Sequence, residues 1–320
     1  MAIKVCIVST VCNPGKEILA LFIDYHLSIG FEHIILFFEN LSDEALPKAR
    51  EYTNVTVLLG DRELKQKQMK NKTFNIMFAP GIKHPIPRQV LNQETAINIA
   101  SEMGFDWMLH LDQDELFYPE NCSVKEHFEK FSDTNTGDII YYNHEAVPEK
   151  MEIENFFKEV TLFKLNGFFL KRLNIEPAFY KKYFPQRMYF NSYGNGKSAV
   201  RVAKGALPSG VHTFHPSPLF PETVFSLDCS ILHYFCTGFS NYWEKFKYIS
   251  KLKEIWFDPL PENKFYFEAR DAAIKNDIGL ALDIYEKQVM LKEPEIVSEL
   301  LKLGIIKYIN YPKEALGKIP

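Results

Sequence analysis

The chain has 320 residues, 46% of them hydrophobic and 24% charged, so it is long enough for one large α/β domain or two smaller ones. Its net charge of −4 leaves no basic excess to neutralise a phosphate backbone, which argues against nucleic acid as a partner. The five widely spaced cysteines indicate reduced thiols and therefore a cytoplasmic location. A position on the cytoplasmic surface of a membrane is compatible with this. Because no apolar run approaches the ~20 residues that cross a bilayer, no transmembrane segment is predicted.

Predicted strands and helices alternate through the first part of the chain. A β-branched run over 3–9 predicts the first strand, and apolar residues at helical spacing predict a helix over 17–29. Further strands are expected at 33–38, 55–59, 106–111 and 138–143, and a helix at 88–104. The Lys- and Gln-rich stretch 61–85 ends in two prolines and is expected to be a loop. This alternation predicts an α/β fold with a mixed, mostly parallel sheet flanked by helices.

The rest of the chain has a different pattern. Short aromatic runs with strand character, broken by Gly and Pro, are expected at 160–163, 188–190, 211–214 and 231–235. Helices are then expected at 241–255, 263–276, 279–292 and 294–303. We therefore expect an α/β domain over 1–240, whose second half begins at 146, and a helical C-terminal extension over 241–320.

The strongest chemical signal is Asp112-Gln113-Asp114-Glu115, which follows an apolar strand. Two carboxylates at positions i and i+2 can converge on one hard cation such as Mn²⁺ or Mg²⁺. Ligands of parallel sheets bind at the carboxyl ends of the strands, where this motif lies. A cation there could stabilise the charge that builds on a diphosphate leaving group. The alternative is a solvated acidic loop, and Glu115 either supports the metal from behind or faces solvent.

Several other segments accompany this motif in a fixed order. They are the Asn13 loop, the helical segment 22–30, the acidic turn 39–43, the Lys-Ser…Arg segment 196–201, Val211-His212, Leu232-His233-Tyr234 and Lys245. As a set, over residues 3–250, they resemble the GT-A glycosyltransferases of family 2 and family 92. The resemblance implies a GT-A, Rossmann-like core and metal-dependent transfer of a sugar from a UDP-sugar to a saccharide or glycoconjugate acceptor. It also implies inversion, with UDP-galactose as a candidate donor.

The resemblance further implies roles for individual residues. Residues 1–145 would form the nucleotide-sugar-binding half of the domain and residues 146–240 the acceptor-binding half. The nucleotide-sugar contacts would come from Glu39, Asp43, Arg88, Gln89, Asn92, Lys197 and Arg201. The metal ligands would be Asp112, Asp114, His212 and His233. For each residue outside the Asp-X-Asp motif, an ordinary structural role is the alternative.

Inversion also requires a general base that removes the proton of the acceptor hydroxyl. Glu145, just past the predicted strand 138–143, is the first candidate by position. Asp228 is the second candidate, and His144 could take the same role.

Two other functions fit the motifs. Paired aspartates also serve phosphoryl chemistry, so a metal-dependent nucleotidyltransferase or phosphohydrolase is the main alternative. A catalytically silent module that binds sugar without metal is another. The sequence has no Walker A loop and no G-x-G-x-x-G motif to point elsewhere.

Overall fold

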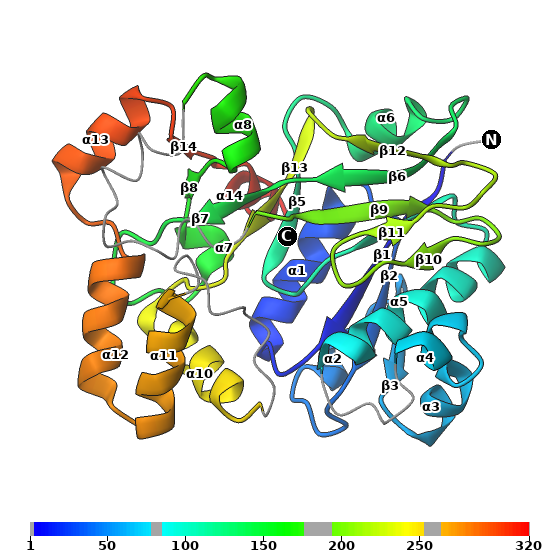
Figure 1. Cartoon of the computed structure of the whole chain (residues 1–320), viewed down its shortest axis with the longest axis horizontal. Coiled ribbons are helices and arrows are strands. Elements are labelled where there is room, and N and C mark those ends of the chain that lie inside the picture. The colour runs from blue at the N-terminus through cyan, green and yellow to red at the C-terminus, as the bar shows by residue number, and fades with distance from the viewer. Residues whose placement is uncertain (1–2, 78–84, 176–193, 253–263, 320) are drawn as a thin grey trace. The chain divides into compact units, whose positions relative to one another are not determined.

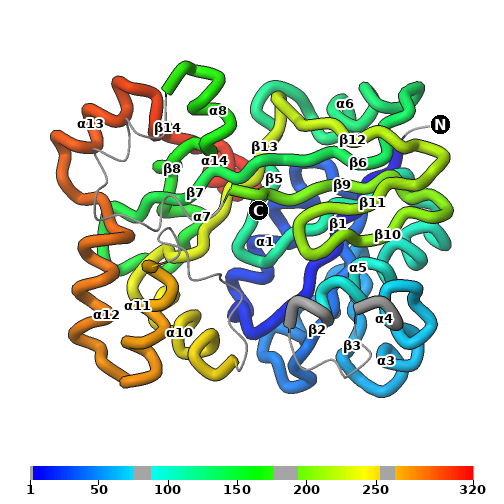
Figure 2. The backbone as a smooth tube through the Cα atoms, viewed as in Figure 1, coloured from blue at the N-terminus to red at the C-terminus, as the bar shows by residue number. Residues whose placement is uncertain are grey.

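The computed structural model describes residues 3–77, 85–175, 194–252 and 264–319. By internal contacts the chain divides into two compact units. Unit 1 contains residues 1–142, 196–231 and 315–320, and unit 2 contains residues 143–195 and 232–314. The chain leaves unit 1 after Tyr142 and returns to it at Gly196. Figure 2 shows the described residues coloured from the N-terminus to the C-terminus.

A seven-stranded sheet forms the centre of unit 1, in the order β12-β6-β9-β4-β1-β2-β3 (Figure 1). Its strands are β1 (Val5–Val11), β2 (His33–Phe38), β3 (Val55–Leu59), β4 (Trp107–His110), β6 (Thr136–Tyr141), β9 (Lys197–Arg201) and β12 (Glu222–Phe225). Strands β3, β2, β1 and β4 are parallel, and β12 is parallel to β6. Strand β9 is antiparallel to both β4 and β6. The predicted α/β fold with a mixed, mostly parallel sheet is confirmed.

Helices flank this sheet. They are α1 (Lys16–Ser28), α2 (Leu46–Ala49), α3 (Arg62–Gln68), α4 (Lys72–Met77), α5 (Pro85–Glu102) and α6 (Val124–Glu129). Helix α5 packs on β1 and β4. All residues of β1 are buried, which explains why apolar residues follow one another over 5–8 instead of alternating with polar ones. Cys6, Val8, Ile35 and Ala96 belong to one core between sheet and helix.

The order of the strands gives the sheet of unit 1 a topological switch point beside β1. The chain runs from β1 outward through β2 to β3 and then returns to form β4 on the other side of β1. Ligands of such sheets bind beyond the carboxyl ends of the strands at this switch point. Here β1 is followed by Cys12 and Asn13, and β4 is followed by Leu111 and Asp112. The sheet therefore places the Asp-X-Asp motif at its switch point.

Unit 2 combines a small sheet with a helical core. Its strands β14 (Ile306–Tyr308), β8 (Leu162–Lys164), β7 (Asn143–Ala146) and β13 (Cys229–His233) are neighbours in that order, and β13 begins in unit 1. Its helices are α7 (Phe156–Glu159), α8 (Gly167–Arg172), α10 (Phe239–Ser250), α11 (Lys264–Lys275), α12 (Ile278–Ile284), the π-helix η3 (Tyr285–Val289) and α13 (Pro294–Lys302). Tyr242, Phe246, Phe265 and Tyr285 are buried together in the core of this unit.

The remaining elements are short. In unit 1, β10 (Leu207–Pro208) pairs with β11 (Phe214–His215), and β5 (Glu115–Pro119) lies beside β13. Helix α14 (Tyr311–Leu316) is close to the C-terminus. In the described part of the chain, no helix combines the length and the apolar character needed to cross a bilayer.

Two local predictions were wrong. The predicted loop over 61–85 contains α3 and α4, because Lys and Gln favour helix and Asp61 caps α3 by accepting the backbone N–H of Leu64 at 3.0 Å. The run 211–214 forms a strand only at Phe214–His215. The C-terminal segment is mainly helical as predicted, and it adds the short strand β14, which pairs with β8. The predicted strand at 188–190 lies outside the described residues, and the domain boundaries stay a prediction.

Candidate functional site

The loop after β4 presents the Asp-X-Asp motif. Asp112, Gln113 and Asp114 are half-buried, and the Gln113 side chain accepts the backbone N–H of Cys12 at 3.0 Å. This hydrogen bond joins the loops that follow β4 and β1, the two strands that border the switch point. The middle residue of the motif therefore fixes the loop, while the two aspartates that flank it carry the charge.

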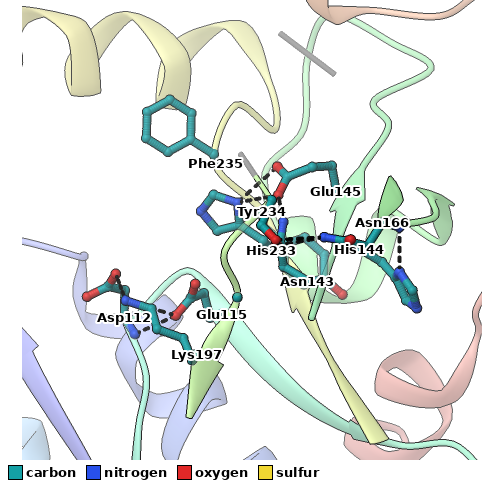
Figure 3. A network of polar contacts seen from close by, with 12 residues as sticks. Asp112, Glu115, Asn143, His144, Glu145, Asn166, Lys197, His233, Tyr234 and Phe235 are labelled. Carbon is teal, nitrogen blue, oxygen red and sulfur yellow. Dashed lines mark hydrogen bonds and ion pairs between the residues drawn. The ribbon is translucent and has the colours of Figure 1, made fainter. Parts of the chain in front are cut away.

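Lys197, the first residue of β9, supplies a buried positive charge to this loop. Its Nζ atom lies 2.6 Å from Asp112 Oδ2 and 3.7 Å from Glu115 Oε2 (Figure 3). Lys197 and Glu115 are each 1% exposed, whereas Asp112 is 29% exposed. Burial alone would lower the pKa of Lys197, but the carboxylates of Asp112 and Glu115 raise it above its ordinary value. Lys197 is therefore a fixed cation behind the motif.

Asp112 is held in its charged form by the same contacts. Burial opposes ionisation, yet Lys197 brings the pKa of the Asp112 carboxyl below its ordinary range. Its Oδ1 atom accepts a hydrogen bond from Gln89 at 3.1 Å, and its backbone N–H donates to Glu115 Oε2 at 2.9 Å. Glu115 therefore faces the interior and braces the loop, so the alternative in which it faces solvent is wrong, and its support of a metal stays a prediction.

A second group of predicted residues converges at the end of β2. Arg88 forms an ion pair with Glu39, and Asn92 also hydrogen-bonds to Glu39. Burial raises the pKa of Glu39, and Arg88 opposes that shift. Because Arg88, Gln89 and Asn92 lie on α5, this helix connects the carboxylate after β2 to Asp112 after β4. Four of the predicted nucleotide contacts thus belong to one polar network.

Asp43 holds the loops that follow β1 and β2. Its side chain is buried, and its two oxygens accept the backbone N–H groups of Asn13 and Ala45, each at 2.9 Å. Asn40 also donates to the side chain of Asn13 at 2.9 Å. Asn13 has a positive φ of 49°, a conformation that asparagine tolerates better than most residues. Asp43 therefore shapes the rim of the site from beneath.

The other predicted cation, Arg201, lies at the far end of β9. It pairs in register with Trp107 at the start of β4, and its guanidinium lies 4.2 Å from the ring centroid of Phe220. Arg201 lies four positions after Lys197 along the strand, which corresponds to about 13 Å. Arg201 therefore does not join Lys197 beside Asp112. Its guanidinium also donates a hydrogen bond to the backbone carbonyl of Phe131. These contacts indicate a structural role for Arg201.

His212 lies in unit 1 near the motif. Its Nδ1 atom is 2.8 Å from the carbonyl oxygen of Gly196, the residue directly before Lys197. Gly196 has a φ of +66°, and a Cβ atom at this position would lie 1.9 Å from the carbonyl oxygen of Tyr141, so glycine is required here. In the described part of the chain, the aspartates of the motif and His212 do not form a closed cluster of three metal-ligating atoms.

Unit 2 contains the first candidate base, in a separate polar group. Glu145 is 3% exposed, and its two oxygens lie 2.8 and 2.9 Å from His233 Nδ1 (Figure 3). Asn143 donates to the same carboxylate. Glu145 and Lys164 are cross-strand partners in β7 and β8. Burial lowers the pKa of Lys164 to about 8, while Glu145 opposes that shift. His233 therefore orients Glu145 within this unit.

The two other candidate bases have different surroundings. Asp228 is 46% exposed and forms an ion pair with Lys130 at 2.6 Å, which lowers the pKa of Asp228. His144 is buried, accepts the backbone N–H of Asn166 at 3.1 Å, and has its pKa lowered to about 3 by burial. A histidine that is neutral and hydrogen-bonded in this way acts as a structural acceptor.

The sequence interpretation missed Gln113, Gly196, Asn143 and Lys164 as parts of these groups. Gln113 stood in the motif as its unassigned middle residue, and Gly196 stood in the matched segment 196–201. Lys164 could not be found in this way, because only the pairing register of β7 and β8 brings it opposite Glu145.

Comparison with known proteins adds two relatives. The chain is 31% identical over 252 residues to one glycosyltransferase-like protein of Arabidopsis thaliana, a match that covers 74% of this chain and 55% of the relative. It is 30% identical over 253 residues to a second such protein of the same plant, with 74% and 48% covered. The chain thus spans about half the length of the curated relatives it matches. No model of a known protein family matches it.

Solved structures give only distant similarities. One is glucosyl-3-phosphoglycerate synthase of Mycobacterium tuberculosis in complex with Mn²⁺, UDP and its product, at 9% identity and a TM-score of 0.27, covering 62% of this chain and 57% of that one. Another is core-mannan synthase A of Aspergillus fumigatus in its Mn/GDP form, at 13% identity and a TM-score of 0.25, covering 46% and 44%. TM-scores this low do not establish a shared fold.

Proposed function

We propose that this chain is a metal-dependent glycosyltransferase that moves a sugar from a UDP-sugar to a saccharide or glycoconjugate acceptor with inversion. The observation that carries the proposal is the position of Asp112 and Asp114 after β4, at the switch point of a mostly parallel sheet. The similarity of 252 residues to a glycosyltransferase-like protein of Arabidopsis thaliana supports the same class of reaction.

The chemistry of the motif fits a hard divalent cation. Asp112 and Asp114 offer carboxylate oxygens in a half-buried loop, and Mn²⁺ and Mg²⁺ prefer such ligands. These two residues would hold the cation, with His212 of the same unit as a further candidate ligand. When bound, the cation would offset the negative charge of a diphosphate leaving group.

The residues around the motif would bind the nucleotide. Glu39 follows β2 at the same edge of the sheet, and its contacts with Arg88 and Asn92 orient its carboxylate. That carboxylate would accept hydroxyl donors such as those of a ribose. Lys197 adds a positive charge next to Asp112, where a diphosphate would lie close to the cation. Asp43 would act by shaping the rim, since its two oxygens accept backbone N–H groups.

Analysis of the reaction products separates this proposal from phosphoryl chemistry. The protein is incubated with Mn²⁺, a panel of UDP-sugars and a set of saccharide acceptors, and the products are identified by mass spectrometry. We expect UDP and an acceptor that is heavier by one sugar, with neither formed when a chelator replaces the metal. Release of a sugar 1-phosphate, with UMP attached to the acceptor or set free, would instead identify nucleotidyl transfer or hydrolysis of the diphosphate.

A further inference from the structure

A second group of metal-ligating side chains lies in unit 1, outside the Asp-X-Asp loop. Cys122, His127 and Cys229 each place a ligand atom within 4.8 Å of the other two. Among the described residues, no other set of three or more His, Cys, Asp or Glu side chains meets this condition. Cys122 precedes α6, His127 lies on α6, and Cys229 begins β13. The fold thus gathers three soft ligands from segments about a hundred residues apart in the sequence.

The spacing of the two thiols matches shared coordination. The sulfur atoms of Cys122 and Cys229 lie 3.8 Å apart. Two sulfurs bound to one tetrahedral Zn²⁺ at about 2.3 Å each are separated by about 3.8 Å. A disulfide would require the sulfurs to approach to about 2.05 Å, and neither Cys122 nor Cys229 forms one. The observed spacing therefore fits a bridging cation without movement of either sulfur.

The hydrogen bonding of the His127 ring also favours a bound cation. Its ring is 1% exposed, and its Nε2 atom lies 2.9 Å from the hydroxyl of Tyr141. Its other nitrogen, Nδ1, is buried and has no hydrogen-bond partner in the described part of the chain. A buried polar atom without a partner is costly, and coordination of a cation would remove that cost. Histidines that bind metals commonly hydrogen-bond a second group through their other nitrogen, as Tyr141 allows here.

We propose that Cys122, His127 and Cys229 bind one Zn²⁺ ion, at a site separate from the Asp112 loop. Thiolate and imidazole ligands favour zinc, whereas the carboxylates of the Asp-X-Asp motif favour Mn²⁺ or Mg²⁺. Binding converts two thiols to thiolates and releases two protons, so the bound centre carries no net charge from ion and ligands. Cys122 is half-buried, which gives the ion a path from solvent. The site would fasten the start of β13 to α6.

Zinc titration of the reduced, chelator-treated protein tests this proposal. We expect one equivalent of Zn²⁺ to bind in competition with a chromophoric chelator, and Co²⁺ to give thiolate-to-metal charge-transfer absorption. The Cys122→Ala and Cys229→Ala variants should bind zinc at least about 100-fold more weakly, and Tyr141→Phe about 10-fold more weakly. Because Cys122 is half-buried, we expect Cys122→Ala to fold. This variant alone can test the proposal if Cys229→Ala does not fold.

Two controls separate this site from other binding. Cys236 is buried in the core of unit 2, so Cys236→Ala removes a buried thiol without touching the three ligands and should keep the zinc equivalent. Asp114→Asn should keep it as well, since that residue belongs to the hard-cation motif. The proposal fails if the reduced protein binds no zinc, or if Cys122→Ala and Cys236→Ala bind it equally. It also fails if Cys122 and Cys229 form a disulfide whose reduction yields no zinc-binding protein.

Discussion

Replacing Lys197 by methionine is expected to lower the free energy of unfolding by about 3 kcal/mol, the lower end of the range for breaking a buried ion pair. The lysine is 1% exposed and is the cation that lies between Asp112 and Glu115. Without it, the buried Glu115 carboxylate would lose its 3.7 Å ion pair, and Asp112 would lose its 2.6 Å contact. Urea denaturation of the metal-free protein, with and without the substitution, measures the effect.

Two further variants make this prediction specific. Lys287 forms an exposed i,i+4 ion pair with Asp283 at 2.6 Å, so Lys287→Met should change stability by less than about 1 kcal/mol. The double variant Lys197→Met/Glu115→Gln should recover part of the loss, because it removes the buried carboxylate charge that Lys197 offsets in the wild type. If Lys197→Met is as stable as the wild type, Lys197 is not buried against these carboxylates as described.

Replacing Glu145 by glutamine is expected to reduce turnover by about 10²- to 10⁴-fold, the usual contribution of a general base. Glutamine keeps the size of the side chain and can still contact His233, but it cannot accept a proton from an acceptor hydroxyl. Affinity for the nucleotide-sugar should stay unchanged, because the proposed donor contacts lie in unit 1 and Glu145 lies in unit 2. Steady-state kinetics and donor binding on the same preparations would separate the two effects.

The matched comparison is Asp228→Asn. Asp228 is the second candidate base, but its carboxylate is exposed and paired with Lys130, so we expect its loss to leave most of the turnover. The pH–rate profile provides a further readout, since the wild type should lose activity when the base is protonated and Glu145→Gln should lack that limb. Full turnover in Glu145→Gln would assign Glu145 a structural role, and loss of turnover in Asp228→Asn alone would reverse the assignment.

The parallel part of the fold could be predicted because its signals are local. Strand β1 begins with four consecutive apolar residues, 5–8, and a helix with apolar residues at regular spacing follows it. The Asp-X-Asp motif was recognisable for the same reason, since the carboxylates directly follow a buried strand. The polar side chains at the end of a buried strand can be identified from the residues next to them in the sequence.

The remaining features depend on contacts between distant segments. Strand β9 enters the sheet antiparallel between β4 and β6, and this pairing brings Lys197 to Asp112 across 85 positions of sequence. The same pairing sends Arg201 to the opposite end of the strand, which a spacing of four residues cannot reveal without the strand's direction. The cluster of Cys122, His127 and Cys229 likewise depends on where β13 begins relative to α6. Periodicity carries no information on such pairings.

Calorimetric binding of a panel of nucleotide-sugars, with and without Mn²⁺, to the wild type and to Asp114→Ala tests the central claim most directly. Asp114 is half-buried in the loop after β4, so its truncation removes one carboxylate from the proposed metal site and leaves Lys197 in contact with Asp112 and Glu115. We expect one UDP-sugar to bind the wild type only in the presence of Mn²⁺, and this binding to disappear in the variant. Absence of binding by every nucleotide-sugar under every metal condition would contradict the proposed glycosyltransferase site.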